Sequence, residues 1–317
     1  MRRILAVVIV TATLLATAAC KSDGNQAAPA PLTKVSLGVI PIIDVAPAYL
    51  GKAKGFFRSR GIDLTLVPEQ GGGVIIKGLL AGKYQFGFSN ATSLMSAYAD
   101  GAPLKAIANG VASTGRPGRD YSAVMVRNGS PLLSAKDLAG KRVAVNALKN
   151  LGDTTIRQSV RKAGGDPNHI QFLPMPFPEM ASALQSHLVD AVWVVEPQLS
   201  DVLTQGGQVL ASNFVDTAPD LTVAMYFTGT ALIGKDPSLV NRFTAAIDES
   251  MRYAASHPEE VRSTVGTYTK INDTVRTAMI LPDWPNSVNR ASLERLASLG
   301  TTDGIFSKPP SLDQLLP

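Results

Sequence analysis

The chain has 317 residues, of which 45% are hydrophobic and 17% charged, with 27 Gly and 21 Pro. This composition is that of a folded globular protein and excludes a disordered or collagen-like chain. The net charge of +5 comes without a cluster of Lys and Arg, and aromatic residues make up only 6%, so no nucleic-acid partner is expected. The length predicts one large or two medium domains, because single cores rarely grow beyond ~250–300 residues.

The N-terminus has the pattern of a secretory signal. Met1-Arg2-Arg3 is a short basic region, residues 4–15 are apolar, and Thr17-Ala18-Ala19-Cys20 is a small-residue cleavage site. The segment resembles a bacterial lipoprotein signal, whose Cys becomes the lipidated first residue. A plain signal peptide with a chance Cys, or an uncleaved anchor helix, are the alternatives, although the apolar run is shorter than the ~20 residues of a membrane span.

We therefore expect a lipoprotein signal peptide over residues 1–19, lipidation at Cys20, and a flexible tether over residues 20–33 that is rich in Ala and Pro. The protein would then be lipid-anchored on the extracytoplasmic face of the cell membrane. Cys20 is the only cysteine, which excludes an intrachain disulfide and a metal site built from cysteines.

After the tether, apolar strand-like runs alternate with helix-like segments, which predicts parallel strands joined by crossover helices. In the first part of the chain, strands are predicted over 35–40, 62–67, 84–88 and 104–111, and helices over 46–59, 74–80 and 91–99. The order then repeats, with strands over 142–146, 170–175 and 190–196, and helices over 154–163 and 178–186. Two similar units predict two lobes with a cleft between them.

Two further strands, 122–127 and 223–233, are expected to cross between the lobes, and the chain becomes mainly helical after Gly234. The predicted division is a discontinuous lobe one over 34–121 and 229–317, and a lobe two over 122–228. The predicted fold class is therefore α/β, with two βαβ-rich lobes.

Several segments of the chain resemble one family, the substrate-binding proteins of ABC importers for nitrate, sulfonates, taurine and thiamine-precursor pyrimidines. The segments are Gly38–Leu50, Lys54-Gly55-Phe56-Phe57, Gly61–Leu64, Leu80–Gly87, Asp137–Asn146 and Asp190–Pro197. The resemblance implies a type II periplasmic-binding fold that closes around one small molecule. It also implies permease and ATPase subunits as partners, no cofactor, and a monomer.

Ligands of open α/β sheets bind beyond the carboxyl ends of the strands, where helix N-termini offer free N–H groups. Four junctions of this chain fit that description, and ordinary turns and helix caps are the alternative interpretation. The candidate ligand-binding residues there are Ile42, Asp44, Gly72, Gly73, Asn90, Ala91, Thr92, Asn146, Gly152, Asp153 and Thr154. Asp44 is equally well explained as a helix N-cap.

Three further candidates lie on the predicted strands. Glu196 ends a strand, so its carboxylate is expected to face the cleft and accept hydrogen bonds from an amine, amidine or aminopyrimidine; an exposed loop carboxylate is the alternative. Trp193, three residues earlier, should lie on the opposite sheet face, in the core or in the cleft. Tyr226 could form an apolar or stacking wall. Trp284 is expected to pack, and closing the cleft from the side of lobe one is the alternative.

The sequence offers no catalytic constellation. His169, His187 and His257 lie in predicted loops or turns and are expected at the surface, and no H-E-x-x-H or G-x-S-x-G motif is present. We therefore expect a binding protein rather than an enzyme, and no metal. Helix N-termini favour a sulfonate and Glu196 favours an amine, so an organic sulfonate or taurine-like ligand is preferred. A thiamine-precursor pyrimidine, an enzyme on the same fold and a sensory module are the alternatives.

Overall fold

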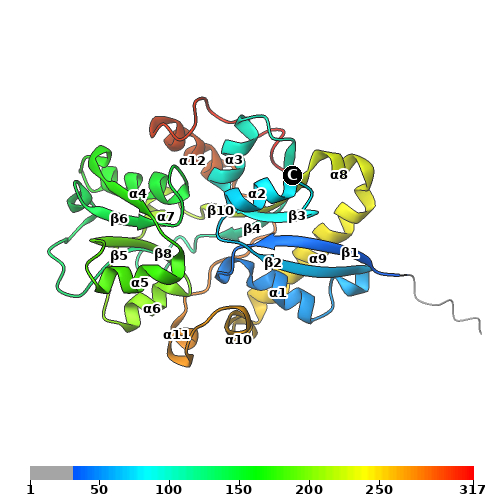
Figure 1. Ribbon diagram of the computed structural model, residues 1–317, viewed down its shortest axis with the longest axis horizontal. Coiled ribbons are helices and arrows are strands. Elements are labelled where there is room, and N and C mark those ends of the chain that lie inside the picture. Colours follow the sequence, from blue (N-terminus) through cyan, green and yellow to red (C-terminus); the bar gives the residue numbers. More distant parts are fainter. Residues whose placement is uncertain (1–30) are drawn as a thin grey trace, which may run out of the picture. The chain divides into compact units, whose positions relative to one another are not determined.

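Two five-stranded sheets organise residues 31–317, the part of the chain that the computed structural model describes. The predicted signal peptide (1–19), the lipidation site Cys20 and most of the tether (20–33) lie outside the described residues. Residues Leu32–Pro317 form one compact unit, and both sheets belong to it (Figure 1).

The first sheet has the strand order β2-β1-β3-β10-β4. Its strands are β1 (Thr33–Val39), β2 (Ile62–Pro68), β3 (Phe86–Asn90), β4 (Leu104–Ala112) and β10 (Thr222–Gly229). β1 pairs in parallel with β2 and β3, whereas β10 is antiparallel to β3 and β4. The helices of this part are α1 (Ala46–Ala53), α2 (Gly72–Leu80) and α3 (Ala91–Ala99).

The second sheet repeats this scheme with the order β7-β6-β8-β5-β9. Its strands are β5 (Ser122–Val126), β6 (Arg142–Val145), β7 (Gln171–Pro174), β8 (Ala191–Val195) and β9 (Gln208–Ala211), and its helices are α4 (Leu151–Lys162), α5 (Phe177–Gln185), α6 (Gln198–Thr204) and α7 (Asn213–Thr217). β6 pairs in parallel with β7 and β8, and β5 is antiparallel to β8 and β9. The predicted repeat is therefore real, and each lobe is built on its own sheet.

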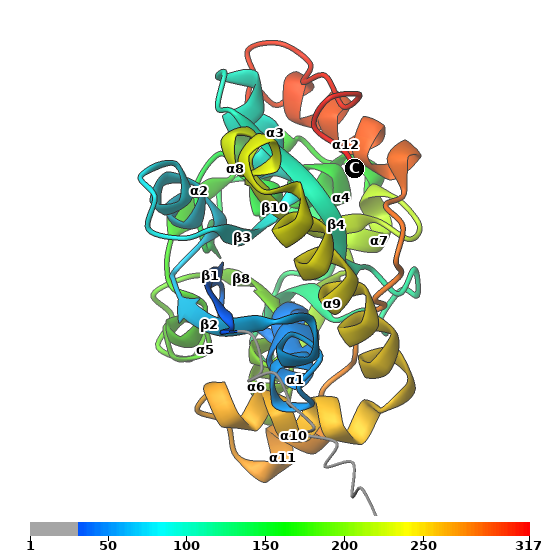
Figure 2. The same ribbon diagram turned by 90° about the vertical axis from the view of Figure 1, so that its right-hand side faces the viewer.

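The chain after β10 is helical, as expected. The helices are α8 (Thr230–Lys235), α9 (Pro237–Ser256), α10 (Pro258–Tyr268), α11 (Asp273–Ala278) and α12 (Arg290–Thr302). Helix α9 runs along the first sheet, in contact with α1 and β4 (Figure 2). Its buried Phe243 ring stacks on Phe86 at 3.7 Å between centroids. Helices α11 and α12 also contact α6 and α4 of the second lobe.

Two predicted elements differ from the structure. The expected strand 223–233 ends at Gly229, and Thr230–Lys235 is helix α8, because an apolar run alone does not distinguish a strand from a buried helix. Strand β10 pairs with β3 and β4 of the first sheet. The chain therefore rejoins the first sheet at Thr222, whereas the predicted lobe boundary is residue 229. The helix expected over 46–59 stops at Ala53, since Gly55 adopts a left-handed φ of 82°.

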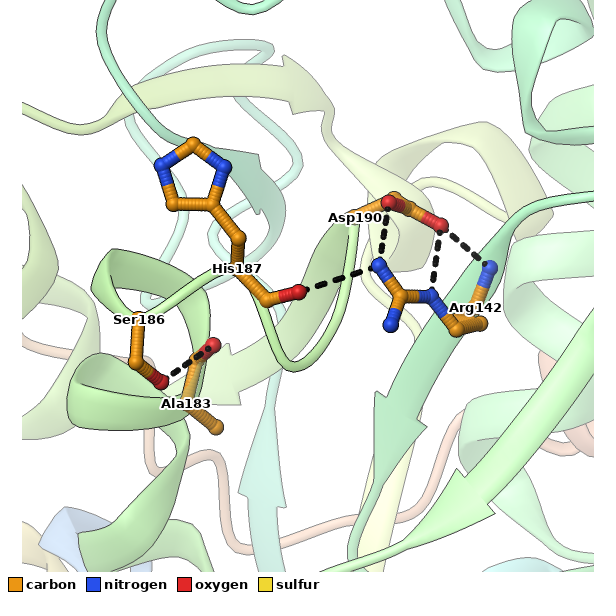
Figure 3. A network of polar contacts seen from close by, with 5 residues as sticks. All are labelled: Arg142, Ala183, Ser186, His187 and Asp190. Atoms are coloured by element: carbon orange, nitrogen blue, oxygen red, sulfur yellow. Dashed lines mark hydrogen bonds and ion pairs between the residues drawn. The ribbon is translucent and has the colours of Figure 1, made fainter.

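An ion pair fixes the beginnings of the parallel strands in the second lobe (Figure 3). The Asp190 carboxylate accepts hydrogen bonds from the Arg142 backbone N–H (2.8 Å), Nε (3.2 Å) and Nη2 (2.9 Å), and Nη2 also donates to the His187 carbonyl. This pairing, with Arg142 as the main cause, lowers the pKa of Asp190. The rings of His187 and His169 are exposed, and His257 stacks on Tyr253.

Candidate ligand-binding site

A small cavity is lined by residues of both lobes and lies at the carboxyl ends of β1, β3, β6 and β8. The first lobe contributes Ile40, Ile42, Asp44, Phe88, Asn90, Val223 and Ala224, and the second contributes Asn146, Leu151, Phe177, Trp193, Val195 and Phe214. The space open to a water-sized molecule is only about 20 Å³, which is enough for about one water. Wider hollows elsewhere are open to solvent, whereas this one lies where the topology places ligands in such sheets.

Two asparagines position the helices that begin at this cavity. Asn90 is the N-cap of α3, and its Oδ1 accepts a hydrogen bond from the Ser93 N–H at 2.9 Å. Asn150 caps α4 through its bond from the Leu151 N–H, and its Nδ2 donates to Ser93 Oγ at 2.9 Å. The cap of α4 is therefore bonded to the first turn of α3, and this contact joins the two lobes beside the cavity.

Trp193 packs in the core of the second lobe and also lines the cavity. Its ring lies edge-on to Phe177 (5.6 Å) and Phe214 (6.0 Å), and its Nε1 donates to Ser122 Oγ at 2.9 Å. The beginning of α4 lies directly on the indole: a Cβ on Gly152 would lie 2.5 Å from the ring. Gly152 therefore permits this close packing, and it does not line the cavity.

Asp44 lies in a short 3-10 turn, Ile43–Val45, after β1, and is only 2% exposed. Its side chain caps no helix, since the N-cap of α1 is Val45, and its Oδ1 has no hydrogen-bond partner among the described residues. Burial raises the pKa of Asp44 to about 7; a bond from its own backbone N–H opposes this, and the charge of Asp120 adds to it. A buried carboxylate with one unpartnered oxygen thus belongs to the cavity wall.

Glu196 is buried but is directed away from the cavity. Its Oε1 accepts hydrogen bonds from the Ile280 N–H and Ser200 Oγ, both at 2.9 Å, and its Oε2 accepts from the Ser200 N–H at 3.0 Å. Desolvation raises its pKa to about 7, and these bonds oppose the shift. The carboxylate therefore ties the end of β8 to α6 and to the segment after α11. Trp193, three residues earlier, faces the opposite side of the sheet, as alternation predicts.

The remaining predicted site residues do not line the cavity; they are Gly72, Gly73, Ala91, Thr92, Asp153, Thr154 and Tyr226. Gly72 permits α2 to pack on Ser89, whose Oγ would lie 2.0 Å from an added Cβ. The Asp153 Oδ2 accepts a bond from the Lys149 N–H, and Tyr226 packs against Phe88. Five of the predicted residues do line the cavity: Ile42, Asp44, Asn90, Asn146 and Trp193.

The apolar part of the wall was not predicted. It consists of Ile40, Phe88, Leu151, Phe177, Val195, Phe214, Val223 and Ala224. Most of these residues end a strand or begin a helix, so the strand-end argument could have been extended to them. Apolar side chains at such positions are also common in hydrophobic cores that bind no ligand, so the sequence does not distinguish a cavity wall from a core there.

Residues 31–317 contain no helix long and apolar enough to cross a membrane. The same residues contain no group of three His, Cys, Asp or Glu side chains placed to hold a metal ion.

Two curated proteins are similar to this chain in sequence. BAB2_1146 of Brucella abortus (strain 2308), named only as a binding protein, is 25% identical over 226 residues, which are 70% of this chain and 67% of that protein. The riboflavin-binding protein RibY of Chloroflexus aurantiacus is 22% identical over 266 residues, 81% of this chain and 74% of RibY.

Solved structures confirm the predicted fold class, the type II periplasmic-binding fold. The ligand-binding component of an ABC-type import system from Staphylococcus aureus matches with a TM-score of 0.77 and 15% identity, over 90% of this chain and 96% of that one. The aliphatic sulphonate-binding protein SsuA from Escherichia coli matches with a TM-score of 0.72 and 19% identity, over 89% and 96%. The desulfurization enzyme DszB is also similar, with a TM-score of 0.63 and 17% identity over 89% and 96%.

The family model described as NMT1/THI5-like matches residues 42–261, which include the whole second lobe and most cavity residues. The chain belongs to the NMT1/THI5-like family.

Proposed function

We propose that this chain is the solute-binding component of an ABC import system, which takes up one small organic molecule between its lobes and delivers it to a permease. The observation that carries the proposal is the cavity itself: residues of both sheets meet there at strand ends, with Asp44, Asn90 and Asn146 as the polar groups in an apolar and aromatic wall. A few convergent polar groups in an otherwise apolar concavity are typical of small-molecule sites.

Binding requires the lobes to separate and close again. Ligand pockets usually measure ~300–1,000 Å³, far more than the 20 Å³ open here. Polar contacts hold the lobes together beside the cavity, among them the Ile43 N–H bonded to the Glu196 carbonyl at 3.1 Å and the Asn150–Ser93 bond. A ligand that contacts both lobes would replace part of this stabilisation and favour the closed arrangement.

For the ligand itself, we propose an organic sulfonate or a taurine-like molecule, with a thiamine-precursor pyrimidine as the alternative. The beginnings of α3 and α4 near the cavity suit an anionic group, and the aromatic wall of Phe88, Phe177, Trp193 and Phe214 suits a planar ring. SsuA is named for an aliphatic sulphonate and RibY for riboflavin, so relatives of this fold bind chemically different ligands.

Binding is favoured over catalysis. The similarity to DszB shows that the fold also occurs in an enzyme. The described residues that line this cavity, however, include no His, Cys, Ser or Lys. Asp44 is therefore the one described lining residue that could serve as a general base near neutral pH. A sensory module that signals to a membrane receptor would use the same cavity, and neighbouring permease and ATPase genes would argue for transport instead.

The test of the proposal is a ligand screen followed by small-angle scattering. Taurine, alkanesulfonates, nitrate, aminopyrimidines and riboflavin are added separately to the purified mature protein. A specific ligand at a hundredfold excess over its Kd should stabilise the fold by about 2.7 kcal/mol, and saturation should change the radius of gyration without changing the secondary structure. If no compound raises the unfolding temperature and none changes the scattering profile, the proposal is wrong.

We further propose that the protein is a monomer, anchored by a lipid on Cys20 to the extracytoplasmic face of the membrane, where it meets the permease and ATPase subunits. The basis is the small-residue site Thr17-Ala18-Ala19-Cys20 after an apolar run. Labelled fatty acid should be incorporated into the wild type and not into Cys20→Ser, which should remain unlipidated. Equal labelling of both proteins would contradict the anchor.

A further inference from the structure

Asp44 is almost completely buried, and one oxygen of its carboxylate is not used by the fold. The backbone of its turn is held from several sides: the Ile42 carbonyl accepts a bond from the Tyr268 hydroxyl at 3.0 Å, and the Asp44 carbonyl accepts one from Trp284 Nε1 at 3.3 Å. The turn is therefore fixed without the side chain. Asp44 Oδ1 has no hydrogen-bond partner among the described residues although the residue is 2% exposed.

Burying an unpaired carboxylate is costly, and folded proteins normally avoid it. The other described groups that face Asp44 do not neutralise it. Asp120 carries the same charge, and the buried phenols of Tyr121, Tyr226 and Tyr268 lie close enough for the charge of Asp44 to raise their pKa. Among the described residues that line the cavity, Asp44 has the one ionisable side chain. A positive partner would have to come from outside the chain.

We propose that Asp44 recognises the ligand through a nitrogen that bears a hydrogen, so that the ligand is an amine, amidine or aminopyrimidine rather than a simple anion. This inference rests on the proposed function of solute binding at this cavity. The wall around the carboxylate supports it, because Trp193, Phe88, Phe177 and Phe214 can pack on a cationic or planar nitrogen group. Taurine and aminopyrimidines satisfy the requirement, whereas nitrate and plain alkanesulfonates do not.

Pairs of compounds in which one member has an amino group and the other lacks it test the inference. The pairs are taurine with ethanesulfonate, and 4-aminopyrimidine with 4-methylpyrimidine, titrated by calorimetry into the mature wild type, Asp44→Asn and Asp248→Asn. Asp248 is a partly buried carboxylate of α9 outside the cavity, and its replacement should change no affinity. The amine-bearing member of a pair should bind at least about tenfold more tightly to the wild type. Asp44→Asn should remove most of that preference and change the affinity of the member without an N–H group by less than about threefold.

A second measurement does not depend on the identity of the ligand. If Asp44 is retained for binding at a cost to the fold, Asp44→Asn without ligand should raise the unfolding temperature at pH 8 by about 2–5 °C. The gain should disappear near pH 5, where the wild-type carboxyl is protonated and uncharged. A lower unfolding temperature of Asp44→Asn at pH 8 would instead show a structural role, for example toward the phenols of Tyr121 and Tyr226, and would overturn the inference.

The two proposals fail in different ways. If ethanesulfonate and 4-methylpyrimidine bind as tightly as their partners, or if Asp44→Asn weakens both members of a pair equally, the assignment of Asp44 is wrong and solute binding stands. If neither these compounds nor nitrate or riboflavin binds the wild type, solute binding itself fails, and the assignment of Asp44 fails with it.

Discussion

Replacing Trp193 by alanine should lower the free energy of unfolding by about 3–5 kcal/mol, the usual cost of removing a large buried aromatic side chain. The indole is 3% exposed, lies edge-on to Phe177 and Phe214, and supports the start of α4 at Gly152. Its loss would leave a hole beneath the second-lobe wall and leave Ser122 Oγ without the Nε1 donor. Because the same ring lines the cavity, affinity for a ligand found in the screen should fall at least about tenfold.

A matched variant separates the effect on binding from the effect on stability. Phe243→Ala removes an equally buried aromatic ring from the first-lobe core, where it stacks on Phe86, and should also cost about 3–5 kcal/mol. Phe243 does not line the cavity, so the affinity of the folded protein should stay within about twofold. Denaturant unfolding and calorimetry on both variants, below their midpoints, give the comparison. An unchanged affinity in Trp193→Ala would remove the indole from the site.

The strand and helix order, the repeat and the strand-end location of the site could be predicted from the sequence, because alternating periodicity and topology determine them. Asn90 ends β3 and Asn146 follows β6, and the structure brings both to the cavity wall. Alternation predicts that Trp193 and Glu196 lie on opposite faces of the sheet, but it could not give which of the two side chains lines the cavity. Glu196 lies one residue beyond β8, and the cis bond to Pro197 follows it; its direction depends on donors from α6 and from Ile280, which is distant in the sequence.

The apolar wall of the cavity and the unpartnered oxygen of Asp44 could not be predicted from the sequence for a different reason. A carboxylate at a strand end is found in caps, loops and sites alike, and only the packing of Trp284 and Tyr268 on its turn shows that the backbone is held independently. The lobe assignment of β10 likewise depends on pairing with β3 and β4. Long-range pairing of this kind leaves no local pattern in the chain.

Glu196 should make the stability of the protein depend on pH. Its pKa is about 7 in the folded state, against 4.5 for an unburied side chain, and burial is the main cause. Between these values the folded state binds a proton that the unfolded state has lost. The contribution of Glu196 to the free energy of unfolding is therefore greatest below pH 4.5 and falls as the pH rises to about 7, by about 3 kcal/mol in all. Asp44 and Asp153, whose pKa values are raised to about 7 and about 6, act in the same direction.

Glu196→Gln isolates this contribution, because the amide does not titrate and the other carboxyls are unchanged. The difference in unfolding free energy between the wild type and Glu196→Gln should shift by about 3 kcal/mol between pH 4.5 and pH 8, in favour of the wild type at the lower pH. Glu259→Gln, on the exposed first turn of α10, should give a difference below about 0.5 kcal/mol at both values. Urea unfolding of the three proteins at several pH values would measure it, and a constant difference for Glu196→Gln would contradict the raised pKa.

Removing the carboxylate altogether should destabilise the protein most at low pH, where Glu196 contributes most to the free energy of unfolding. In Glu196→Ala the N–H groups of the buried Ser200 and the partly buried Ile280 lose their acceptor. A buried N–H that is left unpaired costs about 1–3 kcal/mol. With the hole that the side chain leaves, the loss of unfolding free energy should reach about 3–5 kcal/mol near pH 4.5 and shrink by about 3 kcal/mol toward pH 8, as for Glu196→Gln. Helix α11 and the segment after it should exchange their amide hydrogens faster, because Glu196 is their polar link to β8. The carboxylate does not line the cavity. Any change in the Kd of the folded variant should therefore come from altered closure of the lobes and not from a lost contact with the ligand. Amide exchange that is unchanged around Ile280 would show that the packing of α11 on α6 holds the lobes together without Glu196.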